Sequence, residues 1–328
     1  MSTIKPPQKI NTIVIGAGPI GLATGIALQR AQIPYVILEK GCIVNSIFNY
    51  PTNMTFFSTS KKLEIGGVPF ISHSDKPTRK EALEYYRRLQ EAHSLNIQFY
   101  ETVTGLKREG DVYKVHTNKG TYPAKNVVVA TGYYGKPNLM NVPGEELPKV
   151  KHYYDEPHPY VGQRVVVVGG ANSACDVALE TWQKGADVTM VVRESALYEK
   201  VKYWIRPNIL NRIKEGSIQA YFKSNVKEIK DASILIQTPE GEKTIGNDYV
   251  LAMTGYTPDF DFFKKLGIKI SQDKDRRPVY NPETLECNLP NVYLAGVILS
   301  GMRTREIFIE NSRHHGELIM SAIQSITV

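Results

Sequence analysis

Two stretches of the chain share the same order of apolar and polar positions. In the first, the apolar run Asn11–Ile15 is followed by Pro19–Arg30, which favours a helix, and then by a second apolar run, Tyr35–Leu38. Short apolar runs bounded by turn residues are typical of strands buried on both faces of a parallel sheet. The stretch therefore predicts a strand–helix–strand unit.

The same order returns in the second half of the chain. Arg164–Val168 is a strand-like run, Ser173–Gln183 favours a helix that runs to Gly185, and Asp187–Val192 is a second strand-like run. Parallel strands joined by a crossover helix form βαβ units. The duplication is at the scale of whole domains, and no short repeat is present.

Further elements are expected around both units. Thr78–Ser94 has apolar residues at near-helical spacing, and the apolar runs Asn126–Ala130 and Tyr249–Met253 each lead into a Thr-Gly pair. The remaining predicted elements are strands and turns at Gln98–Tyr100, Gly105–Arg108, Val112–Thr117 and Gly120–Tyr122, a strand in Asn291–Gly296, and a long helical stretch over Arg305–Ile323.

These elements predict an α/β fold with two Rossmann-like dinucleotide-binding domains. The segment "GKPNLMNVPGEELP" is rich in proline and glycine and is interpreted as a crossover between them. The last strand and helix follow the second unit, so we expect the first domain to be discontinuous. The predicted boundaries are residues 1–155 and 258–328 for the first domain and 156–257 for the inserted one.

A glycine-rich turn joins the first strand to its helix. It is made by Gly16, Ala17, Gly18, Pro19, Ile20 and Gly21. Gly16 permits the tight turn, Gly18 lets a pyrophosphate approach the backbone, and Gly21 lets the helix pack close to the strand. The helix N-terminus offers free N–H groups to phosphates. Glu39, at the end of the next strand, can accept hydrogen bonds from ribose hydroxyls and would repel a 2′-phosphate. The alternative, a glycine-rich loop that binds no ligand, does not explain an acidic residue at this position.

The second turn changes the motif and the charge that follows it. It is made by Gly169, Gly170, Ala171, Asn172, Ser173 and Ala174, with alanine, the smallest substitute, at the middle and last glycine positions. Arg193 stands where the first unit has Glu39, and a cation there favours a ribose 2′-phosphate, hence NADP(H) over NAD(H). Ser195, Lys200 and Lys202 lie just beyond and could assist. The alternative is that Arg193 is an ordinary surface arginine.

Two dinucleotide sites of opposite ribose preference in one chain imply two cofactors that exchange electrons. We expect one cofactor, FAD, to be bound tightly and the other, NADPH, to bind and dissociate in each reaction cycle. The sequence therefore predicts an oxidoreductase.

Composition narrows the class of protein further. A chain of 328 residues with 42% hydrophobic and 22% charged residues suits two globular domains. It has no apolar run of roughly 18 residues or more, and its start "MSTIKPPQKI" lacks the apolar core of a signal peptide, so we expect a cytoplasmic protein without a membrane partner. The net charge of +7 is scattered among many acidic residues, which indicates a solvated surface rather than a nucleic-acid site. Cys42, Cys175 and Cys287 form no close pair, so neither a disulfide framework nor a metal site is expected.

Segments outside the glycine turns resemble those of the bacillithiol disulfide reductases, which have the fold of low-molecular-weight thioredoxin reductases. They are "NYPTNMTFFSTSKKLEIG" at Asn49–Gly66, "KYWIRPNI" at Lys202–Ile209, and "YLAGVILSG…IFIENSRHHG" at Tyr293–Gly316. The resemblance covers nearly the whole chain. It implies an FAD-containing, NADPH-dependent enzyme that reduces the disulfide of the thiol bacillithiol, and a homo-oligomer, as is common for this fold.

The resemblance also assigns residues to the two cofactors. Near the flavin end it places Met54, Thr55 and Ser58, and Gly296 and Val297 close over FAD. Its implied FAD contacts are Gly16, Gly18, Pro19, Ile20, Gly21, Glu39, Lys40, Thr131 and Gly132. The implied NADPH contacts are Gly169, Gly170, Asn172, Ser173, Ala174 and Arg193.

Two departures from these relatives bear on the chemistry. Thioredoxin reductases carry a redox-active C-x-x-C in the NADPH domain, and this chain has none, so a relay through a protein dithiol is not expected. Bacillithiol disulfide reductases commonly have a cysteine in the first turn, where this chain has Ile20. A thiol at a helix N-terminus has a lowered pKa and is a ready nucleophile, whereas isoleucine is inert. The protein is then expected to use the flavin directly on its substrate or to have a different acceptor.

His315 is the candidate catalytic residue. In the fold that the chain resembles, the last helix runs near the flavin, so His315 could donate a proton to a leaving thiolate. The expected partner is a small-molecule disulfide or a small redox protein. Alternative functions are a ferredoxin or flavodoxin reductase, for which a basic surface suits an acidic partner, a flavin monooxygenase, although no F-x-G-x-x-x-H fingerprint lies between the turns, and an NADPH-binding sensor without turnover.

Overall fold

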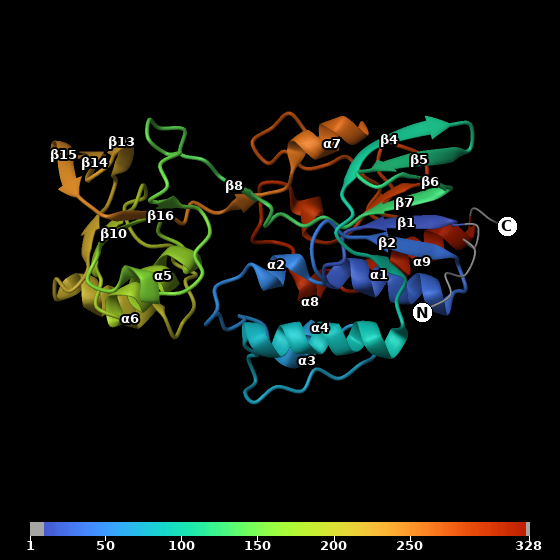
Figure 1. The fold of residues 1–328 in the computed structure, drawn as a ribbon, viewed down its shortest axis with the longest axis horizontal. Coiled ribbons are helices and arrows are strands. Elements are labelled where there is room, and N and C mark those ends of the chain that lie inside the picture. The colour runs from blue at the N-terminus through green and yellow to red at the C-terminus, as the bar shows by residue number, and fades with distance from the viewer. Residues whose placement is uncertain (1–9, 326–328) are drawn as a thin grey trace. The chain divides into compact units, whose positions relative to one another are not determined.

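The computed structural model describes residues 10–325, and this part of the chain divides into two compact units. Unit 1 contains residues 10–48, 54–136 and 256–325, and unit 2 contains residues 49–53 and 137–255. Both units contain a parallel sheet, which confirms the predicted α/β class with one unit inserted in the other (Figure 1). The segment "MSTIKPPQKI", for which no signal peptide is expected, lies outside the described residues except for Ile10.

Unit 1 is built on a five-stranded parallel sheet in the order β18-β7-β1-β2-β3, beside a three-stranded antiparallel sheet in the order β4-β5-β6. Every residue of β1, β7 and β18 is buried, which explains why these strands are continuous apolar runs in the sequence. The strands are β1 (Thr12–Ile15), β2 (Tyr35–Leu38), β3 (Ile97–Gln98), β4 (Val103–Glu109), β5 (Val112–Thr117), β6 (Thr121–Ala124), β7 (Asn126–Val129) and β18 (Val292–Leu294).

Helices of unit 1 cover the parallel sheet and carry its connections. The α-helices are α1 (Pro19–Arg30), α2 (Asn45–Phe48), α3 (Ser60–Leu63), α4 (Arg79–His93), α7 (Phe260–Leu266), α8 (Ile309–Ser312) and α9 (His315–Ser325), and η2 (Gly296–Ser300) is a 3₁₀-helix. The expected helix at Thr78–Ser94 is confirmed as α4, with Thr78 and Glu81 forming a capping box at its start. α9 packs against α1 where Gly316 faces Thr24.

The expectation of one long helix over Arg305–Ile323 is wrong. The chain instead forms two helices, α8 and α9, separated by Arg313 and His314. The Asn311 side chain accepts a hydrogen bond from the N–H of Phe308 at 2.7 Å, so helical bonding begins only after Phe308. Arg313 donates to the carbonyl of Glu64 at 3.0 Å and thereby holds the break against the segment after α3.

Unit 2 repeats the architecture of unit 1. Its parallel sheet has the order β12-β11-β10-β16-β9, and a second, antiparallel sheet has the order β13-β14-β15. The elements are β9 (Val150–Lys151), η1 (His158–Tyr160), β10 (Arg164–Val168), α5 (Asn172–Gln183), β11 (Asp187–Val191), α6 (Arg206–Lys214), β12 (Gln219–Tyr221), β13 (Asn225–Lys230), β14 (Ser233–Thr238), β15 (Gly241–Gly246) and β16 (Tyr249–Ala252). The connections between the units contain β8 (Lys136–Pro137) and β17 (Tyr256–Thr257), which pair with each other.

The two sheets differ in where their outermost strand lies in the sequence. In unit 1 the strand beside β7 is β18, which comes last, whereas in unit 2 the strand beside β16 is β9, which comes first. Because β9 belongs to the sheet of unit 2, that unit starts at residue 137 rather than at the expected 156, and it also includes residues 49–53.

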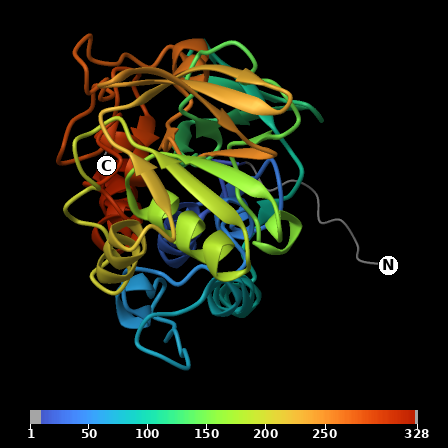
Figure 2. The ribbon, with the colours of Figure 1, turned by 90° about the vertical axis from the view of Figure 1, so that its left-hand side faces the viewer.

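Alternate residues of β10 point to opposite faces of the unit 2 sheet. Val165 and Val167 belong to a buried cluster with residues of α5, whereas Val166 belongs to a cluster with Ile234 and Ile236 of β14. The parallel strands therefore lie between the helices and the antiparallel sheet, as Figure 2 shows for the yellow-green and gold strands. Within residues 10–325, no helix is both long and apolar enough to cross a membrane.

We predict that Gly316→Ala destabilises unit 1 by about 1–2 kcal/mol. A methyl group at this position would lie 2.7 Å from Cα and 2.9 Å from N of Thr24, and these backbone atoms cannot rotate away. The overpacking cost of about 1–3 kcal/mol exceeds the gain in helix propensity of at most about 1 kcal/mol. Urea unfolding monitored by circular dichroism measures the effect. Gly120→Ala is the control, since no atom lies within 4 Å of its added methyl group. Equal stability of the two variants would contradict the prediction.

Candidate dinucleotide sites

The first glycine turn has the geometry that the motif requires. Gly16 has φ +107°, and a Cβ there would lie 2.7 Å from the carbonyl oxygen of Ala130. A Cβ at Gly21 would lie 1.8 Å from the carbonyl oxygen of Gly16, so α1 can start this close to β1 only with glycine. A Cβ at Gly18 would meet no atom within 4 Å. The turn is therefore packed on its protein side at Gly16 and Gly21 and open at Gly18, where a pyrophosphate would approach.

The N-terminus of α1 leaves backbone donors available. The first bond inside the helix runs from the N–H of Leu22 to the carbonyl of Gly18 at 2.9 Å, so the amides of Ile20 and Gly21 precede the helical ladder. Within the described residues no side chain caps α1, and its first turn has no acidic residue that would compete with an anion. The end of the helix thus has the positive dipole and free N–H groups that suit phosphate.

Glu39, at the end of β2, is buried and held by the backbone. One carboxylate oxygen accepts the N–H of Ala17 at 2.7 Å and the other accepts the N–H of Gly41 at 2.8 Å. Each carboxylate oxygen can accept more than one hydrogen bond, so capacity remains for the hydroxyls of a ribose. The same carboxylate fixes the first turn against the end of β2.

Other predicted residues meet this turn at the same edge of the sheet. Glu39 and Lys40 follow β2, Thr131 and Gly132 follow β7, and Gly296 follows β18, and all of these strands run parallel. The hydroxyl oxygen of Thr131 is buried without a hydrogen-bond partner in the described part of the chain. A Cβ at Gly132 would meet nothing within 4 Å. An orphaned hydroxyl and open glycines beside a helix N-terminus fit a bound dinucleotide such as FAD.

Ile20 and Gly296 pack directly against each other. A Cβ at Gly296 would lie 3.1 Å from Cγ1 of Ile20, and Ile20 is buried. The branched side chain therefore fills the space between α1 and η2. Val297 follows in η2 and is half-buried. Met54, Thr55 and Ser58 lie elsewhere in unit 1, in the segment beside the start of α4, where the N–H of Arg79 donates to the carbonyl of Met54 at 2.9 Å.

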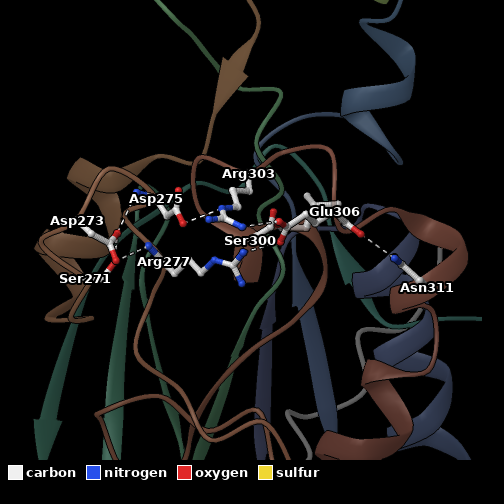
Figure 3. Close-up of polar contacts among 9 residues, drawn as sticks. Ser271, Asp273, Asp275, Arg277, Ser300, Arg303, Glu306 and Asn311 are labelled. Atoms are coloured by element: carbon white, nitrogen blue, oxygen red, sulfur yellow. Dashed lines mark hydrogen bonds and ion pairs between the residues drawn. The ribbon is translucent and has the colours of Figure 1, made fainter. Parts of the chain in front are cut away.

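Ion pairs hold the segment that follows η2 (Figure 3). Arg303 binds Asp275 at 2.7 Å and Glu306 at 3.2 Å, and Arg277 binds Glu306 as well. The N–H of Met302 donates to the carbonyl of Asp275 at 2.7 Å. The loop at residues 271–277 therefore fixes the chain on the far side of η2.

The second turn, in unit 2, has a related geometry. Gly169 has φ +132°, and a Cβ there would lie 2.6 Å from the carbonyl oxygen of Met253, while Ala174 is completely buried. The first bond inside α5 runs from the N–H of Cys175 to the carbonyl of Ala171 at 3.0 Å, which leaves the amides of Asn172 and Ser173 outside the ladder. Gly170 packs against Val192, and its carbonyl accepts the N–H of Tyr198 at 2.8 Å. This turn also suits a phosphate.

Arg193 lies just past β11, in the place equivalent to Glu39, and its side chain is 78% exposed. It forms an ion pair with Glu194 at 2.9 Å, and an exposed pair of this kind is easily exchanged for a phosphate. Lys223, which the sequence did not single out, follows the adjacent strand β12, and its N–H donates to the carbonyl of Glu194 at 2.9 Å. Its exposed side chain lines a depression of about 490 Å³. Its position directly after the strand next to β11 is the feature of the sequence that could have identified it.

The structure disagrees with the prediction that Lys202 helps to bind a phosphate. Its ammonium lies 2.7 Å from a carboxylate oxygen of Asp176, and its side chain is only 11% exposed. Burial raises the pKa of Asp176, and the charge of Lys202 opposes this shift. The N–H of Lys202 donates to the side-chain oxygen of Asn172 at 2.8 Å, so the lysine and the asparagine tie the loop before α6 to the second turn. Ser195 and Lys200 remain exposed.

The structure also disagrees with His315 as a proton donor. The residue is 7% exposed, and Nδ1 of its ring accepts the N–H of Gly296 at 3.1 Å. Burial, with a smaller contribution from His314, lowers the pKa of His315 to about 4. At neutral pH the ring is therefore uncharged, and a neutral imidazole is far too weak an acid to protonate a thiolate.

No cysteine is prepared for thiolate chemistry. Burial raises the pKa of Cys42, Cys175 and Cys287, to about 12 for Cys175 and to about 11 for Cys287. All three are free thiols, and of the three only Cys175 lies on a helix or strand, α5. Across residues 10–325, no group of three or more His, Cys, Asp or Glu side chains could hold a metal ion.

Comparisons with known proteins agree with this description. A family model for pyridine nucleotide-disulphide oxidoreductases matches residues 13–296. Bacilliredoxin reductase Bdr of Bacillus subtilis (strain 168) is 44% identical over 95% of this chain and 96% of its own. The solved structure of bacillithiol disulfide reductase Bdr from Staphylococcus aureus has a TM-score of 0.95 at 43% identity, covering 98% of this chain and 100% of that chain. Thioredoxin reductase of Lactococcus lactis, at 20% identity over 98% of this chain and 100% of its own, has a TM-score of 0.76 and supports the fold alone.

These matches confirm the resemblance expected from the sequence. The family uses FAD and NADPH, and each unit contains one of the two glycine-rich turns described above. The chain therefore belongs to the pyridine nucleotide-disulphide oxidoreductase family, where it groups with the Bdr reductases as an FAD-dependent oxidoreductase.

Proposed function

We propose that the protein passes electrons from NADPH, through FAD, to a low-molecular-weight disulfide, and that this acceptor is bacillithiol disulfide. The net reaction consumes one NADPH, one proton and one disulfide, and yields NADP⁺ and two thiols. The observation that carries the proposal is the similarity over the full length to Bdr reductases, one of which is named for bacillithiol disulfide. The paired turns, one followed by an acid and the other by a base, support the use of two different dinucleotides.

The residues of unit 1 are suited to hold FAD. Gly18 leaves room for the pyrophosphate, the amides of Ile20 and Gly21 face it, and Glu39 is set to receive the ribose. Thr131 offers a buried hydroxyl that has no other partner in the described chain. FAD, when bound, supplies the two-electron redox centre that no side chain provides.

The residues of unit 2 are suited to hold NADPH. The amides of Asn172 and Ser173 lie at the start of α5, and Arg193 and Lys223 supply positive charge near the place expected for the 2′-phosphate. Lys202 and Asp176 keep the neighbouring loop in place rather than contact the phosphate themselves. The residues for which we propose cofactor contacts are therefore largely those predicted from the sequence.

The chain supplies no thiolate for the disulfide step. Because burial raises the pKa of each cysteine, all three thiols are protonated at neutral pH. Ile20 occupies the first-turn position, where a thiol would have been activated. We infer that the disulfide is reduced without a covalent mixed disulfide to this protein.

The decisive experiment is anaerobic stopped-flow of the flavin-loaded protein. We expect NADPH to bleach the flavin absorbance, and bacillithiol disulfide to restore it much faster than glutathione disulfide or ferredoxin does. Failure of NADPH to reduce the flavin would contradict the proposed electron path. Restoration by ferredoxin but by no disulfide would contradict the proposed acceptor and leave the path intact.

Arg193→Ala is expected to raise the KM for NADPH about tenfold and to change the KM for NADH less than about twofold. The variant loses one charge-assisted contact to the 2′-phosphate, worth about 1.4 kcal/mol at an exposed site. Steady-state kinetics with both coenzymes measure the difference, and NADH, which has no 2′-phosphate, is the internal control. An equal effect on both coenzymes would show that Arg193 does not recognise the phosphate.

Replacing all three cysteines, as Cys42→Ser, Cys175→Ala and Cys287→Ser, is expected to leave kcat for the disulfide within about twofold of the parent protein. The expectation follows from raised thiol pKa values, since a protonated thiol is a poor nucleophile. NADPH consumption per bound flavin measures it. A fall of more than about tenfold at normal flavin content would reveal a participating thiol.

A further inference from the structure

The contact between His315 and Gly296 is the polar arrangement that the proposed chemistry leaves unused. His315 is the first residue of α9, and Gly296 is the first residue of η2. The Nδ1 atom of the ring lies 3.1 Å from the backbone nitrogen of Gly296. A backbone N–H can only donate, so Nδ1 is unprotonated and the ring proton is on Nε2.

Gly296 needs this acceptor because of its place in the fold. The N–H of the preceding residue, Ala295, donates to the carbonyl of Val129 and continues the sheet, but Gly296 has φ +83° and turns the chain away from it. Gly296 is buried, so without His315 its N–H would lie inside the protein with no partner. Such an orphaned donor is costly and is relieved by movement of the chain.

The same contact joins three elements that surround the first turn. Gly296 packs on Ile20 of α1, and Gly316, next to His315, packs on Thr24 of α1. The imidazole of His315 therefore completes a link between α1, η2 and α9. The ion pairs of Figure 3 hold the chain after η2 at Arg303, and a backbone hydrogen bond from Met302 to Asp275 holds it there as well, but neither holds the Gly296 end.

We propose that His315 is a positioning residue, whose neutral imidazole accepts the Gly296 N–H and so sets the position of the η2 turn against α1 in the FAD site. It acts through Gly296 and Val297 and transfers no proton to the substrate. The inference rests on the proposed function only in requiring that unit 1 binds FAD. The low pKa of His315, about 4, keeps the ring an acceptor throughout the neutral range.

Three variants of His315 separate this role from proton donation and from simple packing. His315→Asn keeps an acceptor near the position of Nδ1, His315→Gln moves the acceptor one methylene further, and His315→Leu removes it. His314→Leu is the matched control, because His314 is the exposed neighbour of the buried His315. FAD affinity of the apoprotein, followed by flavin fluorescence, and hydrogen exchange of the peptide that contains residues 296–300 are the two readouts that need no turnover.

We expect His315→Leu and His315→Gln to weaken FAD binding roughly tenfold or more and to speed exchange at residues 296–300. His315→Asn and His314→Leu should bind FAD within about threefold of the parent protein, and His315→Asn should keep kcat. If His315→Leu does not fold, the comparison of Asn with Gln decides the question.

Three outcomes would overturn the proposal. Unchanged FAD affinity and exchange in His315→Gln would show that the acceptor is not needed. Equal losses in Asn and Gln would indicate packing alone, and a loss in kcat of roughly 100-fold or more in His315→Asn with normal FAD affinity would restore a role in proton transfer. Absence of FAD binding by the parent protein would instead contradict the proposed function itself.

Discussion

A single close approach shapes unit 1: the carbonyl oxygen of Gly16 lies where a side chain at residue 21 would be. With only 1.8 Å between that oxygen and an added Cβ, no residue but glycine lets α1 start so near β1. This approach brings the N-terminus of α1 to the end of the sheet, beside Glu39 and Thr131. In unit 2 the last motif position is Ala174, and a Cβ added at Gly169 would lie only 3.2 Å from its methyl carbon, so the absence of a side chain at Gly169 leaves room for that methyl group. The two units thus form the same strand–turn–helix arrangement with different residues at the last position of the motif.

The charged side chains at the ends of β2 and β11 differ in how firmly they are held as well as in the sign of their charge. Glu39 is buried and fixed by two backbone N–H groups before any ligand arrives, so binding a ribose there costs little conformational entropy. Arg193 is exposed and, among the described residues, forms its ion pair with its neighbour Glu194, so it must give up that pair and lose side-chain freedom to bind a phosphate. A preorganised acid suits a resident cofactor, and a mobile base suits one that comes and goes.

The parts of the fold that were predictable from the sequence are those set by local pattern. The strand–helix–strand units around Gly16 and Gly169 are found as expected, because buried parallel strands are short apolar runs and the glycine spacing marks the turn between strand and helix. The two-residue strand β9 carries no such signal, since its pairing with β16 depends on the folded sheet, and the predicted domain boundary missed it for that reason. The break between α8 and α9 depends on Asn311 and Arg313, whose hydrogen-bond partners are fixed by the tertiary structure.

Burial explains why the surroundings of two basic residues differ from those expected. Lys202 stands in a basic segment after Arg193, but the fold turns it onto Asp176, so its charge is already neutralised. His314 lies in the turn before α9 and is exposed, whereas His315 is the first residue of that helix and is buried. In the core an imidazole loses the hydration that favours its charged form. The hydrogen bond from the N–H of Gly296 also stabilises the uncharged form of the ring. Both effects disfavour an acid and favour an acceptor, which is why the same histidine that suggests proton transfer in the sequence is better suited to hold a turn in the structure.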